Sequence, residues 1–268
     1  MQLLTRNNRN VTLTNAGVEF LAGCKSVVEK MNATVDKTKR ANQHELGGLN
    51  IGYSYIAMCG KLPELLTSFE SRYPKIIVQP HSAASTHQLE KLLHDELDFC
   101  FLTGPIESTN IETHLFQMDK FVVIVQNDHP LASKGSMSVS ELAKEKILMC
   151  CDTTISKFNE HVFDFLEAAQ LHPEVEMIPQ SHVGLLGLVT LGRGVCVATE
   201  GYGCIFAKEL SVLKLTGTDQ KLPTLMAWRK NHSTAARQTF LNYVQEQQRS
   251  QAMQESPEAQ QEAEVDIS

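Results

Sequence analysis

The chain has 268 residues, 42% of them hydrophobic and 21% charged, so it can bury a full core and is not disordered throughout. Its formal net charge of −7 argues against nucleic-acid binding over its whole surface. Seven cysteines without a Cys-x-x-Cys pair favour a reducing compartment. The sequence shows no signal peptide and no apolar run of about 20 residues, so we expect a cytoplasmic protein without a membrane segment.

The first 48 residues predict a β-hairpin followed by a long helix. Two β-favouring runs, Leu3–Arg6 and Val11–Leu13, flank the turn-forming pair Asn7-Asn8. Thr14 then stands where a helix N-cap belongs, with its hydroxyl placed to accept a bond from a first-turn amide.

The long helix carries a narrow apolar stripe. Its members recur at alternating spacings of three and four residues, and they are Leu21, Cys24, Val28, Met31 and Val35. So thin a stripe favours pairing with a helix of a second subunit. The alternative is that the stripe packs on the chain's own domain.

From Leu49 onward, strands alternate with helices. The pattern predicts strands at 49–53, 76–79 and 98–102, with helices at 57–73 and 86–97 between them. This β-α-β-α-β order predicts parallel strands with helices on both faces of a sheet.

A second α/β unit is predicted beyond a strand at 121–126. Its elements are a short helix at 138–142, strands at 147–151, 175–178 and 195–199, and helices at 157–169 and 183–192. Strands at 213–215 and 223–229 and a helix at 234–247 complete the fold. The stretch 248–268 is rich in Gln, Glu, Ala and Ser without an apolar period, which predicts a disordered tail.

Several short motifs occur in a specific order along the chain. The hairpin region contributes Leu3, Leu4, Arg6, Arg9, Val11, Leu13, Thr14, Ala16 and Gly17. The remainder contributes Leu49-x-Ile51-Gly52, Leu62-Pro63, Glu96-Leu97-Asp98, His129-Pro130-Leu131, Gly192-x-Gly194 and Trp228-Arg229-Lys230. Each motif is weak alone, but together they resemble the wing, linker helix and effector domain of LysR-type transcriptional regulators.

The resemblance implies an α/β fold. It implies a bilobal effector domain like a type 2 periplasmic binding protein, preceded by a β-hairpin wing and a long linker helix. The implied division is a wing at 1–14, a linker and dimerisation helix at 15–48, subdomain I at 49–122 plus 224–247, subdomain II at 123–223, and the tail at 248–268. Crossover strands are expected near 119–126 and 221–229.

Polar residues at strand ends are the candidate effector-binding groups, because ligands of open α/β sheets bind where strands lead into helix N-termini. The candidates are Ser54, Tyr55, Ser82, Ser85, Thr103, Thr154, His182 and Thr199. The resemblance places Ser54 and Ser85 at positions that contact an effector carboxylate. The alternative is that these Ser and Thr residues only cap helices. A small carboxylate and a mostly neutral metabolite both fit.

The resemblance implies a transcription regulator that senses a small molecule and forms a dimer or tetramer. It places Arg6 and Arg9 of the wing near DNA phosphate or the minor groove. In the family a helix-turn-helix precedes the wing, whereas only Met1 and Gln2 precede it here. We therefore expect that this chain alone does not bind an operator specifically.

Two alternatives to a complete regulator are a stand-alone solute-binding protein and a dominant-negative dimerisation partner of full-length regulators. The sequence has no metal-ligand spacing, no phosphate loop and no Gly-x-Ser-x-Gly elbow, so we predict no enzyme, metal site or cofactor. Peroxide-sensing LysR-type regulators use two cysteines of the second subdomain. The pair Cys150-Cys151 keeps a redox role as a minor alternative.

Overall fold

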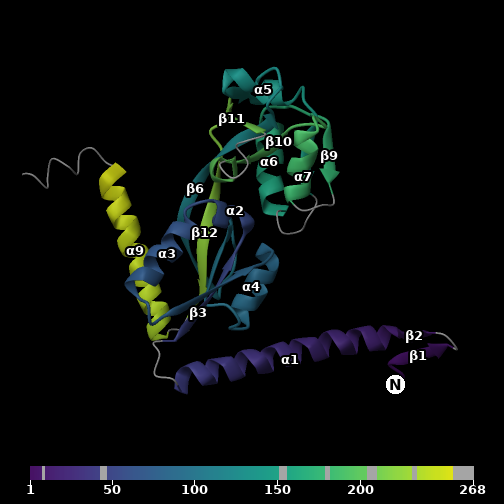
Figure 1. Cartoon of the computed structure of the whole chain (residues 1–268), viewed down its shortest axis with the longest axis vertical. Helices are drawn as coiled ribbons and strands as arrows, with labels where there is room; N and C mark the ends of the chain where they lie inside the picture. Colours follow the sequence, from purple (N-terminus) through teal and green to yellow (C-terminus); the bar gives the residue numbers. More distant parts are fainter. Residues whose placement is uncertain are drawn as a thin grey trace, which may run out of the picture.

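The computed structural model describes residues 1–7, 10–42, 47–150, 156–178, 182–203, 210–230 and 234–255. Figure 1 shows two lobes and, beneath them, the long helix α1 (Asn15–Asn42). We call the lobe next to α1 lobe I and the lobe farther from it lobe II. No described helix combines the length and apolarity needed to cross a membrane.

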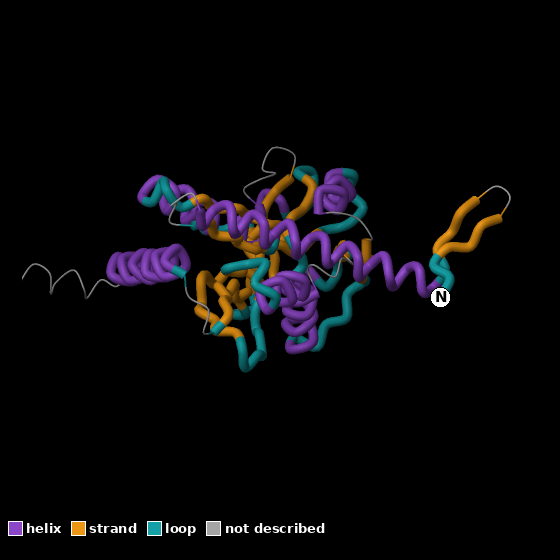
Figure 2. The backbone as a smooth tube through the Cα atoms, turned by 90° about the horizontal axis from the view of Figure 1, so that it is seen from below, coloured by secondary structure: helices purple, strands orange, loops and turns teal. Residues whose placement is uncertain are grey.

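The predicted hairpin and its helix cap are confirmed. Strands β1 (Leu4–Asn7) and β2 (Asn10–Leu13) pair in antiparallel fashion. The Thr14 hydroxyl accepts a hydrogen bond from the Gly17 amide at 3.0 Å and donates one to the Gln2 carbonyl at 2.8 Å. The hairpin lies at one end of α1, and the opposite end of α1 leads into lobe I (Figures 1 and 2).

Helix α1 exposes more apolar surface than the predicted stripe. Of that stripe, Cys24 is half-buried and the other four members are exposed. Three further apolar side chains on the helix are also exposed, namely Val18, Phe20 and Val27. The alternative that the stripe packs on the chain's own domain is therefore wrong.

Lobe I is built on parallel strands, as predicted. Strand β3 (Gly48–Tyr53) lies between β4 (Ile77–Ser82) and β5 (Phe99–Thr103) and pairs in parallel with both. Strand β12 (Lys221–Arg229) adds an antiparallel neighbour to β5. Helices α3 (Leu62–Arg72) and α9 (Ala235–Glu255) pack on one face through Phe69 and Phe240, and α4 (Ser85–Leu93) packs on the other through Leu92.

One long strand, β6 (Ile111–Gln126), connects the lobes. It pairs with β12 up to Lys120, and from Phe121 onward with β10 (Cys196–Thr199) and β11 (Leu210–Thr216) of lobe II. Strand β7 (Ser136–Ser138) pairs in parallel with β11.

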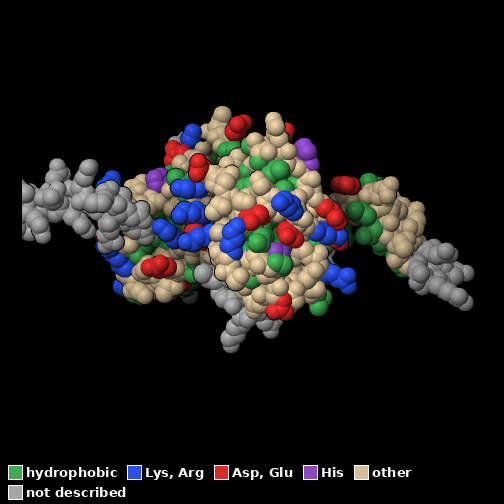
Figure 3. Space-filling view, turned by 90° about the horizontal axis from the view of Figure 1, so that it is seen from above, with side chains coloured by type: hydrophobic (Ala, Val, Ile, Leu, Met, Phe, Trp, Pro, Cys, Tyr) green, Lys and Arg blue, Asp and Glu red, His purple; other side chains and the backbone are tan. Residues whose placement is uncertain are grey.

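The rest of lobe II surrounds a second, smaller sheet. Strands β8 (Ile147–Cys150) and β9 (Val175–Ile178) pair in parallel, and the Leu148 amide donates to the Val195 carbonyl at 2.8 Å, which ties β8 to the chain before β10. The helices are η1 (Ala132–Lys134), α5 (Val139–Leu142), α6 (Ser156–Ala168), α7 (His182–Thr190) and α8 (Glu200–Gly203). Charged side chains of both signs are interspersed on the upper face of the molecule (Figure 3).

The predicted bounds of two helices are wrong. The helix predicted over 57–73 is divided into α2 (Tyr55–Cys59) and α3. Gly60 leaves helical geometry with ψ −136°, and Pro63, in the first turn of α3, starts a new helix. The helix predicted to reach Leu97 ends at Leu93, because Asp95 takes a left-handed conformation with φ 60°.

The C-terminal helix is longer than predicted. It continues to Glu255, whereas we expected it to end at 247 and a disordered tail to begin at 248. The Gln248 side-chain amide donates to the Leu115 carbonyl of β6 at 2.9 Å, which holds the added turns against lobe I. The remainder of the predicted tail, 256–268, lies outside the described residues.

Candidate ligand-binding site

The two lobes touch where α2 of lobe I meets α8 of lobe II. The rings of Tyr55 and Tyr202 meet edge to face with centroids 5.4 Å apart. A Cβ atom on Gly201 would lie 2.3 Å from the Cys59 carbonyl oxygen, so only glycine permits this approach. Ile56 belongs to the apolar cluster of lobe II although α2 is part of lobe I.

A second contact joins the lobes at the end of β5. The His161 Nε2 of α6 and the Gly104 carbonyl oxygen are 3.2 Å apart. The lobes are thus in contact through α2 and α8 and also through α6 and the loop after β5.

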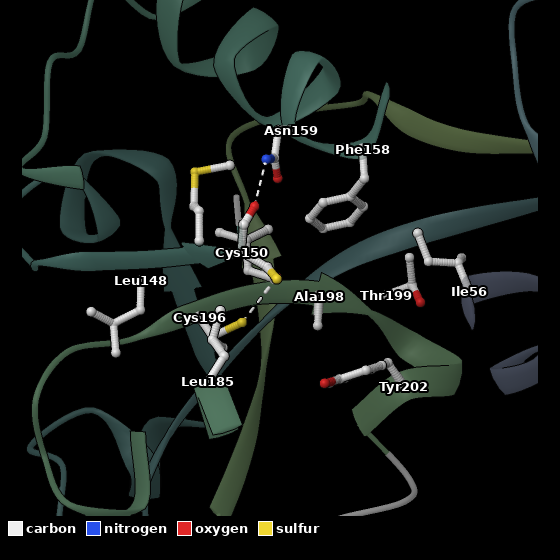
Figure 4. A pocket seen from close by; sticks show the side chains of 12 residues that line it. Ile56, Leu148, Cys150, Phe158, Asn159, Leu185, Cys196, Ala198, Thr199 and Tyr202 are labelled. Atoms are coloured by element: carbon white, nitrogen blue, oxygen red, sulfur yellow. Dashed lines mark hydrogen bonds between the residues drawn. The ribbon is translucent and has the colours of Figure 1, made fainter. Parts of the chain in front are cut away.

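A small pocket of about 30 Å³ opens beside these contacts (Figure 4). Helix α2 lines it from lobe I, while β8, α6, α7, β10 and α8 line it from lobe II. The lining residues are Ile56, Leu148, Met149, Cys150, Phe158, Asn159, Leu185, Cys196, Val197, Ala198, Thr199 and Tyr202. None of these carries a formal charge at neutral pH.

Among the described lining residues, Asn159 is the only one with a side-chain amide, and its exposed fraction is 9%. Its Nδ2 donates a hydrogen bond to the Cys150 carbonyl at 2.9 Å, which fixes the orientation of the amide. Its Oδ1 is buried and has no hydrogen-bond partner within the part of the chain that the structure describes. A buried polar atom is normally paired, so this oxygen is an acceptor available to a ligand.

Two cysteines of the lining, Cys150 and Cys196, point toward one another in Figure 4. Both are buried and free of disulfides, as expected for cysteines that serve as small apolar residues. Burial, with a smaller effect of Cys150, raises the pKa of Cys196 to about 12. Cys196 is therefore a neutral thiol at pH 7, which does not favour the redox alternative. Cys151 lies outside the described residues.

The two tyrosines at the lobe contact are neutral as well. Burial raises the pKa of Tyr55 to about 12 and also raises the pKa of Tyr202. At neutral pH their hydroxyl groups therefore remain protonated and can donate hydrogen bonds.

Of the predicted site residues, two lie at or beside the pocket and two lie at strand ends in lobe I. Thr199, at the end of β10, lines it, and Tyr55 contacts its lining through Tyr202. Ser54 is the N-cap of α2, with its Oγ accepting from the Ala57 amide at 3.3 Å, so it has the capping role we considered. Ser54 and Thr103 lie at the carboxyl ends of the neighbouring strands β3 and β5.

The other predicted residues are elsewhere or not described. Ser82 is exposed at the end of β4, an outer strand of the sheet, and Ser85 is half-buried in the first turn of α4. The N-cap of α4 is Ala84, so Ser85 does not cap this helix. Neither serine lines the pocket. Thr154, Arg9 and the side chains of Arg6 and His182 lie outside the described residues.

Sequence reasoning missed most of the lining, including Asn159 and Tyr202. The missed signal for Asn159 was periodicity, since it shares a face of α6 with Val162 and Leu166 at spacings of three and four residues. A polar residue on an apolar helix face marks either a buried hydrogen bond or a site. Within the described ranges, no group of three or more His, Cys, Asp or Glu is placed to hold a metal ion.

A family model and related sequences both match this chain over most of its length. The family model described as the LysR substrate binding domain matches residues 42–249. The HTH-type transcriptional regulator YnfL of Escherichia coli (strain K12) is 25% identical over 239 residues, covering 88% of this chain and 80% of YnfL. The HTH-type transcriptional regulator AlsR of Bacillus subtilis (strain 168) is 25% identical over 86% of this chain and 77% of its own length.

Solved structures show the same fold. CbnR, a LysR family transcriptional regulator, superimposes with a TM-score of 0.76 at 19% identity, covering 87% of this chain and 81% of CbnR. The effector binding domain of BenM with its effector benzoate gives a TM-score of 0.69 at 21% identity, covering 79% of this chain and 96% of that domain. These matches confirm the bilobal α/β architecture of the type 2 periplasmic binding proteins.

Proposed function

The chain belongs to the LysR family of transcriptional regulators, and we propose that it senses a small molecule held between its two lobes. The observation that carries this proposal is the uncharged pocket at the lobe contact, lined by Ile56 from lobe I and by lobe II elsewhere. The BenM domain with benzoate and the QuiR effector domain with shikimate are similar in fold and hold small molecules.

We take 49–122 plus 224–247 as subdomain I and 123–223 as subdomain II. The separate apolar clusters support this division, because one gathers Leu49, Phe69 and Phe240 and the other spans 121–222 with Ile56 added. Ligand binding would favour one relative angle of the lobes and shift the population between two arrangements.

Pairing of α1 with a second copy would transmit this change. The exposed stripe Leu21, Val28, Met31 and Val35, with half-buried Cys24, supports a helix–helix contact, because isolated proteins rarely leave such surface uncovered. Val28→Glu would place a charge in the contact, so we expect it to convert a dimer or tetramer to monomer in light scattering. Glu19→Gln, on the same helix, is the control and should leave the mass unchanged.

The hairpin is proposed to be the wing, with Arg6 and Arg9 near DNA phosphate or the minor groove. The structure of full-length CbnR with its target DNA is similar in fold to this chain. The expectation that this chain alone does not bind an operator specifically stays a prediction. A gel-shift assay at moderate salt tests it, and nanomolar, sequence-selective binding would contradict it.

A thermal-shift screen of metabolites tests the sensing role. A ligand at 100 times its dissociation constant adds about 2.7 kcal/mol to the free energy of unfolding. Thr199→Val and Ser54→Ala should each weaken the shift caused by a hit, while Ser82→Ala on the exposed end of β4 should not. A shift that persists unchanged in both site variants would contradict the assignment.

A further inference from the structure

Of the two polar atoms of the Asn159 side-chain amide, only Nδ2 has a hydrogen-bond partner among the described residues. Its Nδ2 donates to the Cys150 carbonyl at 2.9 Å, so the amide cannot rotate to present a donor to the pocket without losing that bond. Its Oδ1 is therefore the atom that faces a ligand. This oxygen lies buried near Phe158 (Figure 4), and no described residue pairs with it. An unpaired buried acceptor is unfavourable, and a ligand that supplies an N–H or O–H group removes the cost.

The surroundings disfavour an anion at this position. Among the described residues, no Lys, Arg or His lines the pocket, and most of the lining is aliphatic, aromatic or thiol. A carboxylate placed here would lose its hydration, gain no cation and bring a second acceptor against Oδ1. An uncharged donor loses less hydration than a carboxylate, needs no cation, and can donate a hydrogen bond to Oδ1.

The volume limits the group that enters. A water-sized group needs roughly 10–15 Å³ of such space. The pocket measures about 30 Å³, so it takes only a few atoms, as in a hydroxyl or primary amide end, unless the lobes separate.

We propose that Asn159 is the specificity-determining residue of the ligand pocket, and that the pocket takes the uncharged, hydrogen-bond-donating end of a small molecule, a hydroxyl or amide group. This inference rests on the proposed sensing function and narrows its ligand class. For the end of the ligand that enters this pocket, it favours an uncharged group over a carboxylate.

Acetamide, acetate and acetone provide a matched test, because they have nearly the same shape and differ in charge and donor capacity. Titration of the full chain is followed by the NMR signal of the Ile56 methyl group, which borders the pocket. We expect acetamide to bind at least about tenfold more tightly than acetate or acetone, as one lost hydrogen bond to a buried group implies.

Asn159→Leu removes the acceptor at similar volume and should reduce that preference to within about twofold. Asn242→Leu, on the exposed side of α9, is the matched control and should keep the tenfold preference. Because the wild-type chain already compares the three probes, the test does not depend on the variant folding. Acetate binding as tightly as acetamide, or a preference that survives in Asn159→Leu, would overturn the proposal.

Failure of the inference differs from failure of the proposed function. If a metabolite from the screen binds the wild-type chain and Asn159→Leu leaves its affinity unchanged, the inference is wrong and the sensing role stands. If no metabolite binds and no probe shifts the Ile56 signal, both are wrong.

Discussion

The two lobes are packed differently. Lobe I has a core rich in aromatic rings, in which Phe240 meets both Phe69 and Phe99 with ring centroids 4.9 Å apart, and a buried ion pair joins Asp98 to Arg237 of α9. The core of lobe II is mainly aliphatic, and part of it lines the small pocket that Asn159 also borders. We therefore expect lobe I to act as the more rigid frame, and we propose that lobe II supplies most of the contacts that select the ligand.

The largest expected effect concerns the ion pair of lobe I. Arg237 Nε donates to Asp98 Oδ1 at 2.6 Å, with the two side chains 4% and 9% exposed. Arg237→Met would leave the Asp98 carboxylate buried without its cation, which costs about 3–5 kcal/mol of unfolding free energy. Chemical denaturation at pH 7 measures this loss.

Arg72→Met is the control for that experiment. It breaks an exposed ion pair at 3.1 Å between Arg72 of α3 and Glu246. Glu246 lies on α9, the helix that also carries Arg237. Solvent screens exposed pairs, so the stability should hardly change. Equal losses in the two variants would contradict the view that the Arg237 pair anchors lobe I.

An intermediate effect is expected at the lobe contact. In Gly201→Ala the new methyl group would meet the Cys59 carbonyl, so we expect the lobes to separate and the radius of gyration measured by X-ray scattering to increase. Gly187→Ala in α7 is the control, because a Cβ atom there meets nothing within 4 Å. It should keep the radius and add about 0.5–1 kcal/mol of stability. An unchanged radius in Gly201→Ala would show that the contact does not hold the lobes together.

The smallest expected effect is a pH dependence at Asp119, next to the point where β6 passes between the lobes. Burial raises the pKa of this carboxyl, an effect that the hydrogen bond from Gln117 at 2.6 Å opposes. The folded chain thus holds the proton more tightly than the unfolded chain, and stability is lost as pH rises past the unfolded pKa of about 4.

Asp119→Asn cannot ionise and keeps an oxygen for the Gln117 bond. It should therefore melt at a higher temperature than the wild-type chain at pH 7 and show no such gain at pH 3. A gain of equal size at both pH values would assign the effect to packing instead of ionisation.

Sequence patterns predict an element correctly where it depends on neighbouring residues and has a strong periodicity. Strand β9 has the predicted bounds, and the Thr14 cap is in place, because side-chain alternation and a cap hydroxyl act over a few residues. The first half of β6, from Ile111 to Lys120, was missed. Its side chains are mostly polar or exposed, and it is a strand because it pairs with β12, which follows much later in the chain.

Part of the site was predictable because some of its residues lie in local sequence patterns. Thr199 and Tyr55 follow strand ends, a position that sequence can identify. Asn159 carried a periodicity signal that we did not use. Tyr202 reaches the pocket only because Gly201 allows α8 to approach α2, and such a long-range contact leaves no local pattern.

Hydrogen exchange of the full chain, with and without the metabolite that shifts its melting temperature most, tests the central claim most directly. If the ligand is held between the lobes, the amides of α2 (55–59) and those of β10 and α8 (196–203) should slow together. Slowing confined to a single lobe would contradict a ligand that bridges them.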